Sequence, residues 1–148
     1  MRWTTRNPDV IAAALATHIE LVGAALLVAL AISLPVGVLA ARHGLLRGVA
    51  LGSASVLYSI PSLALFALLV PVLGLGFRSA LLALVSYAVP VLLRALVTGL
   101  RMVPAEVLEA ADGMGLTRHQ RLWRVELPLA LPALLGGLRV AGVTLVSA

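Results

Sequence analysis

Cysteine and lysine are absent from the 148 residues, and charge is scarce. Without cysteine, the chain can form no disulfide, no thiolate metal site and no cysteine nucleophile. Charged residues make up 11% of the chain and hydrophobic residues 61%, so there are too few polar side chains to cover a water-facing surface. The composition therefore predicts a membrane protein and argues against a soluble globular domain.

Motifs for metal binding, nucleotide binding and catalysis are also missing. The three histidines, His18, His43 and His119, are far apart and lack metal-ligand spacing, so we expect no metal site. No Gly-x-x-x-x-Gly-Lys-Ser/Thr phosphate loop is present, so if the protein uses ATP, a partner subunit must bind it. We expect this chain to bind no cofactor and to contain no catalytic residue.

Long apolar runs are what the sequence has in abundance. The thirty residues between Arg47 and Arg78 carry no charge, which exceeds the roughly 20 residues that a helix needs to cross a bilayer. In lipid, only a helix satisfies the backbone polar groups of an open chain. We therefore predict an all-α, polytopic transmembrane helical bundle over residues 17–148, preceded by an N-terminal arm of residues 1–16. The expected spans are residues 17–41, 49–75, 79–100 and 127–148, with a loop of about residues 101–126 before the last one.

Proline and small residues add detail to these spans. Proline lacks an N–H group and clashes with the preceding helical turn, so we expect kinks or breaks at the prolines within or near the spans. These are Pro35, Pro61, Pro71 and Pro90. Small residues recur every four positions, which favours close helix packing either within the chain or between subunits. They are Ala133, Gly137 and Ala141 in the last span, and Gly48 and Gly52 earlier.

The arginines predict an orientation. When the spans alternate sides, six arginines fall on one side, namely Arg42, Arg47, Arg101, Arg118, Arg121 and Arg124. Only Arg2, Arg6 and Arg78 fall on the other side. Because cytoplasmic loops carry an excess of basic residues, we expect the six-arginine side in the cytoplasm and the N-terminus outside.

The loop before the last span contains signals for two short helices. Pro104 suits a first helical position, and Gly113 or Gly115 can end a helix, so we expect one at about residues 105–112. Thr117 and Gln120 have the spacing of a capping box, which predicts a second helix. That helix is expected to run through Val125 and to end before Pro128.

Such a pair of helices has other interpretations. Its spacing is roughly that of a DNA-binding helix-turn-helix, but both flanks enter the membrane within a few residues, which leaves no room for a duplex. We therefore expect no nucleic-acid partner. An ordinary loop whose arginines only set the topology is the second alternative.

The spacing of several residues distinguishes this loop from an ordinary one. Glu109-Ala110-Ala111 is followed by Gly115, four residues after the second alanine, and later by Leu127-Pro128. This pattern resembles the EAA signature of MetI-like permease subunits of bacterial ATP-binding-cassette (ABC) importers. In that family the cytoplasmic loop binds the ATPase, so the resemblance implies an ATPase-coupling loop. Its residues would be Glu109, Ala110, Ala111, Gly115, Leu127 and Pro128.

The resemblance covers about residues 18–143 and narrows to one branch of that family. Several segments are similar to permeases for glycine betaine, choline, carnitine and related osmoprotectants, namely residues 59–65, 71–76, 87–94, 127–133 and 137–139. Where Arg-Asn is common in that branch, this chain has Arg94-Ala95.

The resemblance implies a set of partners and a mechanism. A MetI-like transmembrane domain in the cell membrane would pair with a second copy or a sister permease, two cytoplasmic ATPases that bind ATP and Mg²⁺, and an extracytoplasmic substrate-binding protein. Closure of the ATPases would drive alternating access through the coupling loop. Because the sequence stops within an apolar segment at Ala148, we expect the C-terminal helices of the family to be truncated.

Other functions remain open at this point. The chain could be a MetI-like permease for another small solute such as an amino acid, or a truncated membrane subunit that does not transport. A secondary carrier or channel working alone and a membrane scaffold are alternatives from other classes.

Four residues inside the predicted spans are candidates for a pathway or gate. Arg94 and Arg139 would cost about 2.5–3.5 kcal/mol each at a helix centre, so they either line a polar path or are satisfied by carbonyls and snorkelling. Both share the charge of a quaternary ammonium and are not expected to bind it. Aromatic faces bind such cations, but Tyr58 and Tyr87 are the only mid-span aromatics besides Phe66. We therefore expect the external binding protein to select the substrate.

Overall fold

The computed structural model describes residues 8–147, so Arg2 and Arg6 of the orientation argument lie outside the described part. Every regular element in that part is a helix, and the predicted all-α helical bundle is confirmed. In chain order the elements are α1 (Pro8–Arg42), α2 (Gly44–Ser59), α3 (Ser62–Leu73), α4 (Phe77–Arg101), α5 (Ala105–Gly113), α6 (Arg118–Arg121), the π-helical turn η1 (Leu122–Glu126) and α7 (Leu127–Ser147).

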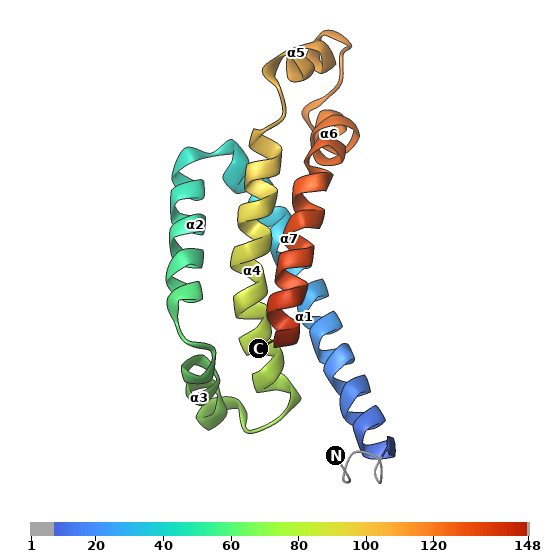
Figure 1. Ribbon diagram of the computed structural model, residues 1–148. Coiled ribbons are helices and arrows are strands. Elements are labelled where there is room, and N and C mark those ends of the chain that lie inside the picture. Colours follow the sequence, from blue (N-terminus) through green and yellow to red (C-terminus); the bar gives the residue numbers. More distant parts are fainter. Residues whose placement is uncertain (1–7, 148) are drawn as a thin grey trace.

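The long helices run side by side. α4 packs between α1 and α7 on one side and α2 on the other, while α3 lies at the opposite end of the molecule from α5 and α6 (Figure 1). Within the described residues, three helices are long and apolar enough to cross a membrane: Asp9–Arg42, Phe77–Arg101 and Arg118–Ser147. α1 begins at Pro8, so it includes the second half of the expected N-terminal arm.

The expected span at residues 49–75 is not one straight helix. α2 and α3 pass the same criteria only as a pair, and they meet at an angle of 93°. Pro61 explains the break, because proline disfavours the helical conformation of the preceding residue. Ile60 is accordingly extended, with φ −75° and ψ 126°. The hydroxyl of Tyr87 on α4 donates to the carbonyl of Ile60, which supplies a partner for a backbone group at the break.

The other prolines do not interrupt their helices. Pro35, Pro71 and Pro90 lie inside α1, α3 and α4, respectively, and each helix continues through its proline. Of the four prolines at which we expected a kink or break, only Pro61 coincides with a complete break between helices.

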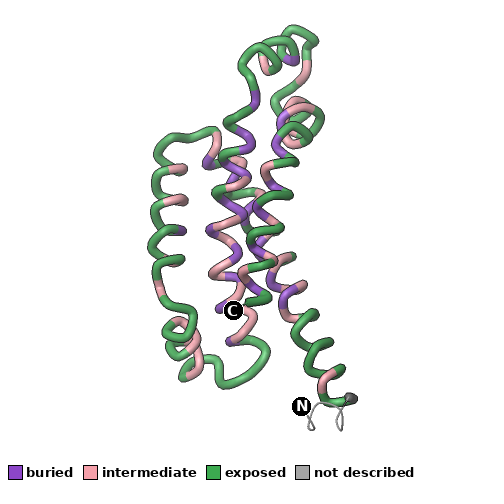
Figure 2. Tube along the Cα trace, in the orientation of Figure 1, coloured by how far each residue is buried: buried purple, intermediate pink, exposed green. Residues whose placement is uncertain are grey.

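α4 is the centre of the bundle. Its buried residues Ala88, Leu92 and Leu96 recur every four positions and so occupy one face. They pack against α1 and α7 in two clusters, and a third cluster joins α4 to α2 and the end of α1. Figure 2 shows the buried residues concentrated on α1, α4 and α7, whereas α2 and α3 are largely exposed.

Small residues allow α7 to approach α4 closely. A Cβ atom added to Gly137 would overlap the Cβ of Ala95, so no larger residue fits there without a shift. The predicted stripe in the last span that begins at Ala133 therefore packs inside the chain. Gly48 and Gly52 differ, because a Cβ on either would meet no atom within 4 Å in the described part of the protein.

Candidate functional site

α5, α6 and η1 form a small helical unit at one end of the bundle, and η1 leads directly into α7 (Figure 1). We call this end of the molecule the loop end. The six arginines that predict the orientation all lie at the loop end, at the end of α1 or α4, at the start of α2, or in α6 and η1. They are Arg42, Arg47, Arg101, Arg118, Arg121 and Arg124. The alternation of the helices therefore collects them on one side, as the sequence predicts.

α5 (Ala105–Gly113) confirms the predicted first helix of the loop, and its end explains the glycine of the pattern. The amide of Gly115 donates to the carbonyl of Asp112 at 2.9 Å, and the amide of Leu116 donates to that of Ala111 at 3.2 Å. These two bonds define a Schellman cap. Gly115 has a φ of +77°, a left-handed conformation that costs other residues about 1–2 kcal/mol.

The Glu-Ala-Ala sequence on α5 has one buried and two exposed residues. Ala111 is 1% exposed and packs within the loop. Glu109 and Ala110 are exposed, and Glu109 makes no ion pair with any residue of the described chain. Within this pattern, Ala111 is buried, whereas Glu109 and Ala110 form an edge that a partner can reach.

The predicted capping box begins the second helix. The amide of Gln120 donates to the Thr117 hydroxyl at 3.3 Å, and the amide of Thr117 donates to the Gln120 side chain at 2.9 Å. Two free amides at the start of α6 are thereby satisfied. One turn further on, the indole N–H of Trp123 donates to Nε2 of His119 at 3.0 Å.

The prediction that this helix ends before Pro128 is wrong. α6 continues through η1 into α7, and Arg118–Ser147 forms one unbroken helical segment. The amide of Leu127 bonds to the carbonyl of Leu122, five residues back, which is the pattern of a π-turn. This wider turn directly precedes Pro128, whose ring would otherwise clash with the carbonyl of the preceding turn.

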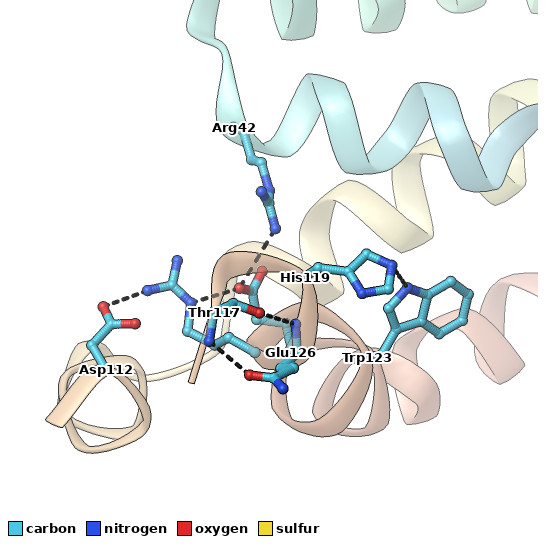
Figure 3. Close-up of polar contacts among 8 residues, drawn as sticks. Arg42, Asp112, Thr117, His119, Trp123 and Glu126 are labelled. Carbon is cyan, nitrogen blue, oxygen red and sulfur yellow. Dashed lines mark hydrogen bonds and ion pairs between the residues drawn. The ribbon is translucent and has the colours of Figure 1, made fainter. Parts of the chain in front are cut away.

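A network of charged side chains ties this unit to the bundle, as Figure 3 shows. Arg121 donates from Nε to Glu126 at 2.9 Å and from Nη1 to Asp112 at 2.5 Å. Arg42, at the end of α1, lies 3.8 Å from the same Glu126 oxygen. Glu126 is only 9% exposed, and these two arginines are the basic partners of its carboxylate. One carboxylate therefore links η1 and α6 to α1, and Arg121 extends the link to α5.

The network favours the charged form of Arg121. Hydrogen bonding to Glu126, and next to Asp112, raises the pKa of Arg121 above its ordinary value and outweighs partial desolvation. A raised pKa means that the stabilisation is fully present below the ordinary value and is lost only as the pH rises through the higher one. Arg121 consequently stays charged across the whole neutral range.

Sequence reasoning had noted Arg121 but missed its partners Asp112 and Glu126. It left Arg121 among the arginines that set the topology, whereas the side chain of Arg121 pairs with two acidic residues of the loop. The available signal was a single acidic residue, Glu126, flanked by Val125 and Leu127 at the start of an apolar span. Such a residue needs a basic partner when it is buried.

Two of the four pathway candidates meet at a groove between α2, α4 and α7. Arg94 donates from Nη2 to the Ser55 hydroxyl at 3.0 Å, and both line the groove with Tyr58. The volume of this groove is about 520 Å³. Its wall on α7 includes Gly136.

The other two candidates do not line that groove. Tyr87 contacts the lining residue Tyr58, with the two ring centroids 5.8 Å apart in an edge-to-face arrangement. Arg139 is an exposed residue of α7 and forms no ion pair within the described chain. In residues 8–147 no group of three or more histidines and carboxylates is placed to hold a metal ion.

The fold and the loop define an integral, multi-pass membrane protein with a helical unit at one end of its bundle. Residues 33–148 match the family described as "Binding-protein-dependent transport system inner membrane component". The chain belongs to this family, and its resemblance to the MetI-like permeases of ABC importers is confirmed.

Similar proteins include several osmoprotectant permeases. The osmoprotectant import permease protein OsmW of Salmonella typhimurium is 40% identical over 131 residues, which covers 85% of this chain and 61% of OsmW. The choline transport system permease protein OpuBB of Bacillus subtilis is 34% identical, covering 87% of this chain and 59% of OpuBB. The ergothioneine transport permease/ergothioneine binding protein EgtU of Helicobacter pylori is 42% identical over 76% of this chain, but that match covers 20% of EgtU. The chain thus spans about three fifths of the length of OsmW and OpuBB.

Proposed function

We propose that this chain is the permease subunit of an ATP-driven, binding-protein-dependent importer for small osmoprotectants. The observation that carries the proposal is the loop, in which an exposed Glu109-Ala110 edge stands on a short helix capped at Gly115 and fastened to the bundle. The family and the osmoprotectant permeases among its similar proteins support the same function.

Three partners follow from this proposal. An ABC ATPase would bind ATP and Mg²⁺ and dock on the loop end, while a second copy or a sister permease would complete the pathway. A substrate-binding protein would deliver the solute on the opposite side. The six arginines at the loop end support a cytoplasmic position for it under the positive-inside rule, and Glu109 would then lie on the side where ATP is available.

The contacts of the loop suggest how it transmits movement. A force on α5 would reach Arg121 through Asp112, and it would pass from Arg121 through Glu126 to Arg42 on α1. α6 also continues without a break into α7. Closure of the ATPases would therefore act on α1 through the charged network and on α7 through the continuous helix.

The substrates named in the similar proteins share one chemical group. Choline, carnitine, glycine betaine and ergothioneine all carry a trimethylammonium group. A solute of this class is accordingly the substrate that we propose. A permease for an amino acid would be the alternative if none of these compounds were transported.

The test is ATP-dependent uptake in proteoliposomes that contain this chain, the ATPase and the binding protein. We expect Glu109→Lys to abolish the stimulation of ATP hydrolysis by the loaded binding protein, because it reverses the charge of the exposed edge. Glu106→Lys is the matched control, since it changes the charge of α5 equally, one turn away. Glu109→Gln separates loss of charge from reversal.

Each outcome discriminates between functions. Unchanged stimulation in Glu109→Lys would contradict the coupling role. Uptake without any ATPase would instead identify a secondary carrier or channel. If no uptake occurred with every partner present, a membrane subunit without transport activity would be the better explanation.

A further inference from the structure

Arg94 carries a charge that no carboxylate in the described part of the chain neutralises. Its contact is with the hydroxyl of Ser55, at 3.0 Å from Nη2, and no ion pair joins Arg94 to an acidic residue within residues 8–147. A hydroxyl is a neutral acceptor, and most donors of the guanidinium fork are left unused by it. The positive charge is therefore available to a ligand.

Arg94 lies well inside α4, away from the end of the helix. Arg94 precedes Arg101, at the end of α4, by seven residues, which is about 10 Å along a helix. Arg94 thus lies within the apolar segment Phe77–Arg101 and not at its end, and its side chain lines the groove. Charged residues inside membrane segments that face a cavity mark sites for substrates or ions.

The groove has the size and chemistry of a small-molecule site. Its volume of about 520 Å³ falls within the range of about 300–1,000 Å³ that is usual for such sites. Besides Arg94, the groove is lined by three residues with hydroxyl groups, Ser55, Tyr58 and Thr98, and the remaining lining is apolar or glycine. Gly136 in the α7 wall leaves space beside it, because a Cβ there would meet no atom within 4 Å.

We propose that this groove binds the carboxylate of a small zwitterionic solute. Arg94 would hold the two carboxylate oxygens with its planar fork. The Ser55 hydroxyl, which donates to the Leu51 carbonyl at 2.8 Å and accepts from Arg94, would orient that fork. Tyr58 lies one helical turn from Ser55 on α2, where its ring would face the trimethylammonium end of the solute. The positive charge of Arg94 would disfavour a solute that has only the cation.

This inference rests on the proposed function and adds to it a preference for solutes that carry a carboxylate. Glycine betaine and carnitine carry both groups, whereas choline has no carboxylate. This chain would therefore bind glycine betaine in preference to choline, independently of the external binding protein. Arg94 would be a specificity-determining residue.

Protection of a single thiol measures this binding without transport. The chain has no cysteine, so Val140→Cys, at an exposed residue that lines the groove on α7, introduces a unique thiol there. In nanodiscs of phosphatidylcholine, we expect glycine betaine to slow the reaction of this thiol with a maleimide and choline to leave the rate unchanged. Adding Arg94→Gln should weaken the protection by glycine betaine about tenfold or more, because a charge-assisted hydrogen bond is lost.

A second variant tests the groove without altering its charge. Gly136→Leu would place a side chain in the open space and should abolish protection by glycine betaine. Gly23→Leu is the matched control on α1, where an added Cβ also meets no atom within 4 Å, and it should leave protection intact.

Several results would overturn the inference. Equal protection by choline and glycine betaine would do so, as would protection that survives Arg94→Gln or Gly136→Leu. Protection by anionic phosphatidylglycerol alone would show that the groove binds a lipid headgroup. Selective protection in a chain that supports no uptake would support the binding site and contradict the proposed transport function. Failure of the site and failure of the transport function are therefore distinguishable.

Discussion

At the scale of single residues, one oxygen of Glu126 serves both Arg121 and Arg42. Glu126→Gln would leave both guanidinium groups facing a neutral amide, so we expect a loss of about 1–3 kcal/mol in the free energy of unfolding. Thermal unfolding in detergent measures this loss. Glu109→Gln is the control, because Glu109 is exposed, and its effect should stay within about 0.5 kcal/mol. Equal losses in the two variants would show that Glu126 is not a structural link.

Two glycines of the loop, separated by one residue, have opposite requirements. Gly115→Ala forces a side chain into a left-handed conformation and should destabilise the loop by about 1–2 kcal/mol. Gly113→Ala lies inside α5 with free space around its Cβ, and it should stabilise the helix by about 0.5–1 kcal/mol. Hydrogen exchange of the α5 amides would detect both changes. Faster exchange in Gly113→Ala, or unchanged exchange in Gly115→Ala, would contradict the assignment of the cap.

At the scale of elements, the break between α2 and α3 depends on a contact from α4. Tyr87→Phe removes the hydroxyl that bonds to the Ile60 carbonyl and should lower the free energy of unfolding by about 1 kcal/mol. Tyr58→Phe keeps the contact between the two rings and should change stability less. The melting temperatures of the two variants provide the comparison. A larger effect at Tyr58 would mean that ring packing, and not the hydrogen bond, fixes the break.

Sequence alone predicted those elements whose determinants are local. The first loop helix, its glycine cap and the Thr117–Gln120 capping box depend on residues a few positions apart, and all three are present. The break at Pro61 was foreseen only as one of several kinks. Which proline breaks a helix depends on whether a neighbour such as Tyr87 satisfies the freed carbonyl, and that contact spans 27 residues.

The π-turn and the charge network could not be predicted, because each is a tertiary feature. A proline after a short helix usually marks its end, yet here the wider turn lets the helix pass through Pro128. The pairing of Glu126 with Arg42 joins residues far apart in the chain, and it requires α1 to end beside η1. The residues of the family pattern can be recognised from their spacing in the sequence. The contacts that attach the loop to the bundle join distant parts of the chain and cannot.

At the scale of the whole molecule, the two ends differ in chemistry. The loop end collects the charged network and six arginines, whereas the opposite end has Arg78 as its arginine among the described residues. α1, α4 and α7 connect the two ends through a shared apolar core. The arrangement of charge thus matches a protein that spans a membrane with its loop end in the cytoplasm.

Labelling of single thiols tests this orientation, because the natural chain has no cysteine to interfere. Met114→Cys places a thiol after α5 at the loop end, and Leu75→Cys places one between α3 and α4 at the other end. The native side chains are 74% and 82% exposed, respectively, so neither substitution disturbs a core. In intact cells, a membrane-impermeant maleimide should label Leu75→Cys and should reach Met114→Cys only in inverted vesicles. The reverse pattern would place Glu109 outside the cytoplasm and would remove the basis for coupling to an ATPase.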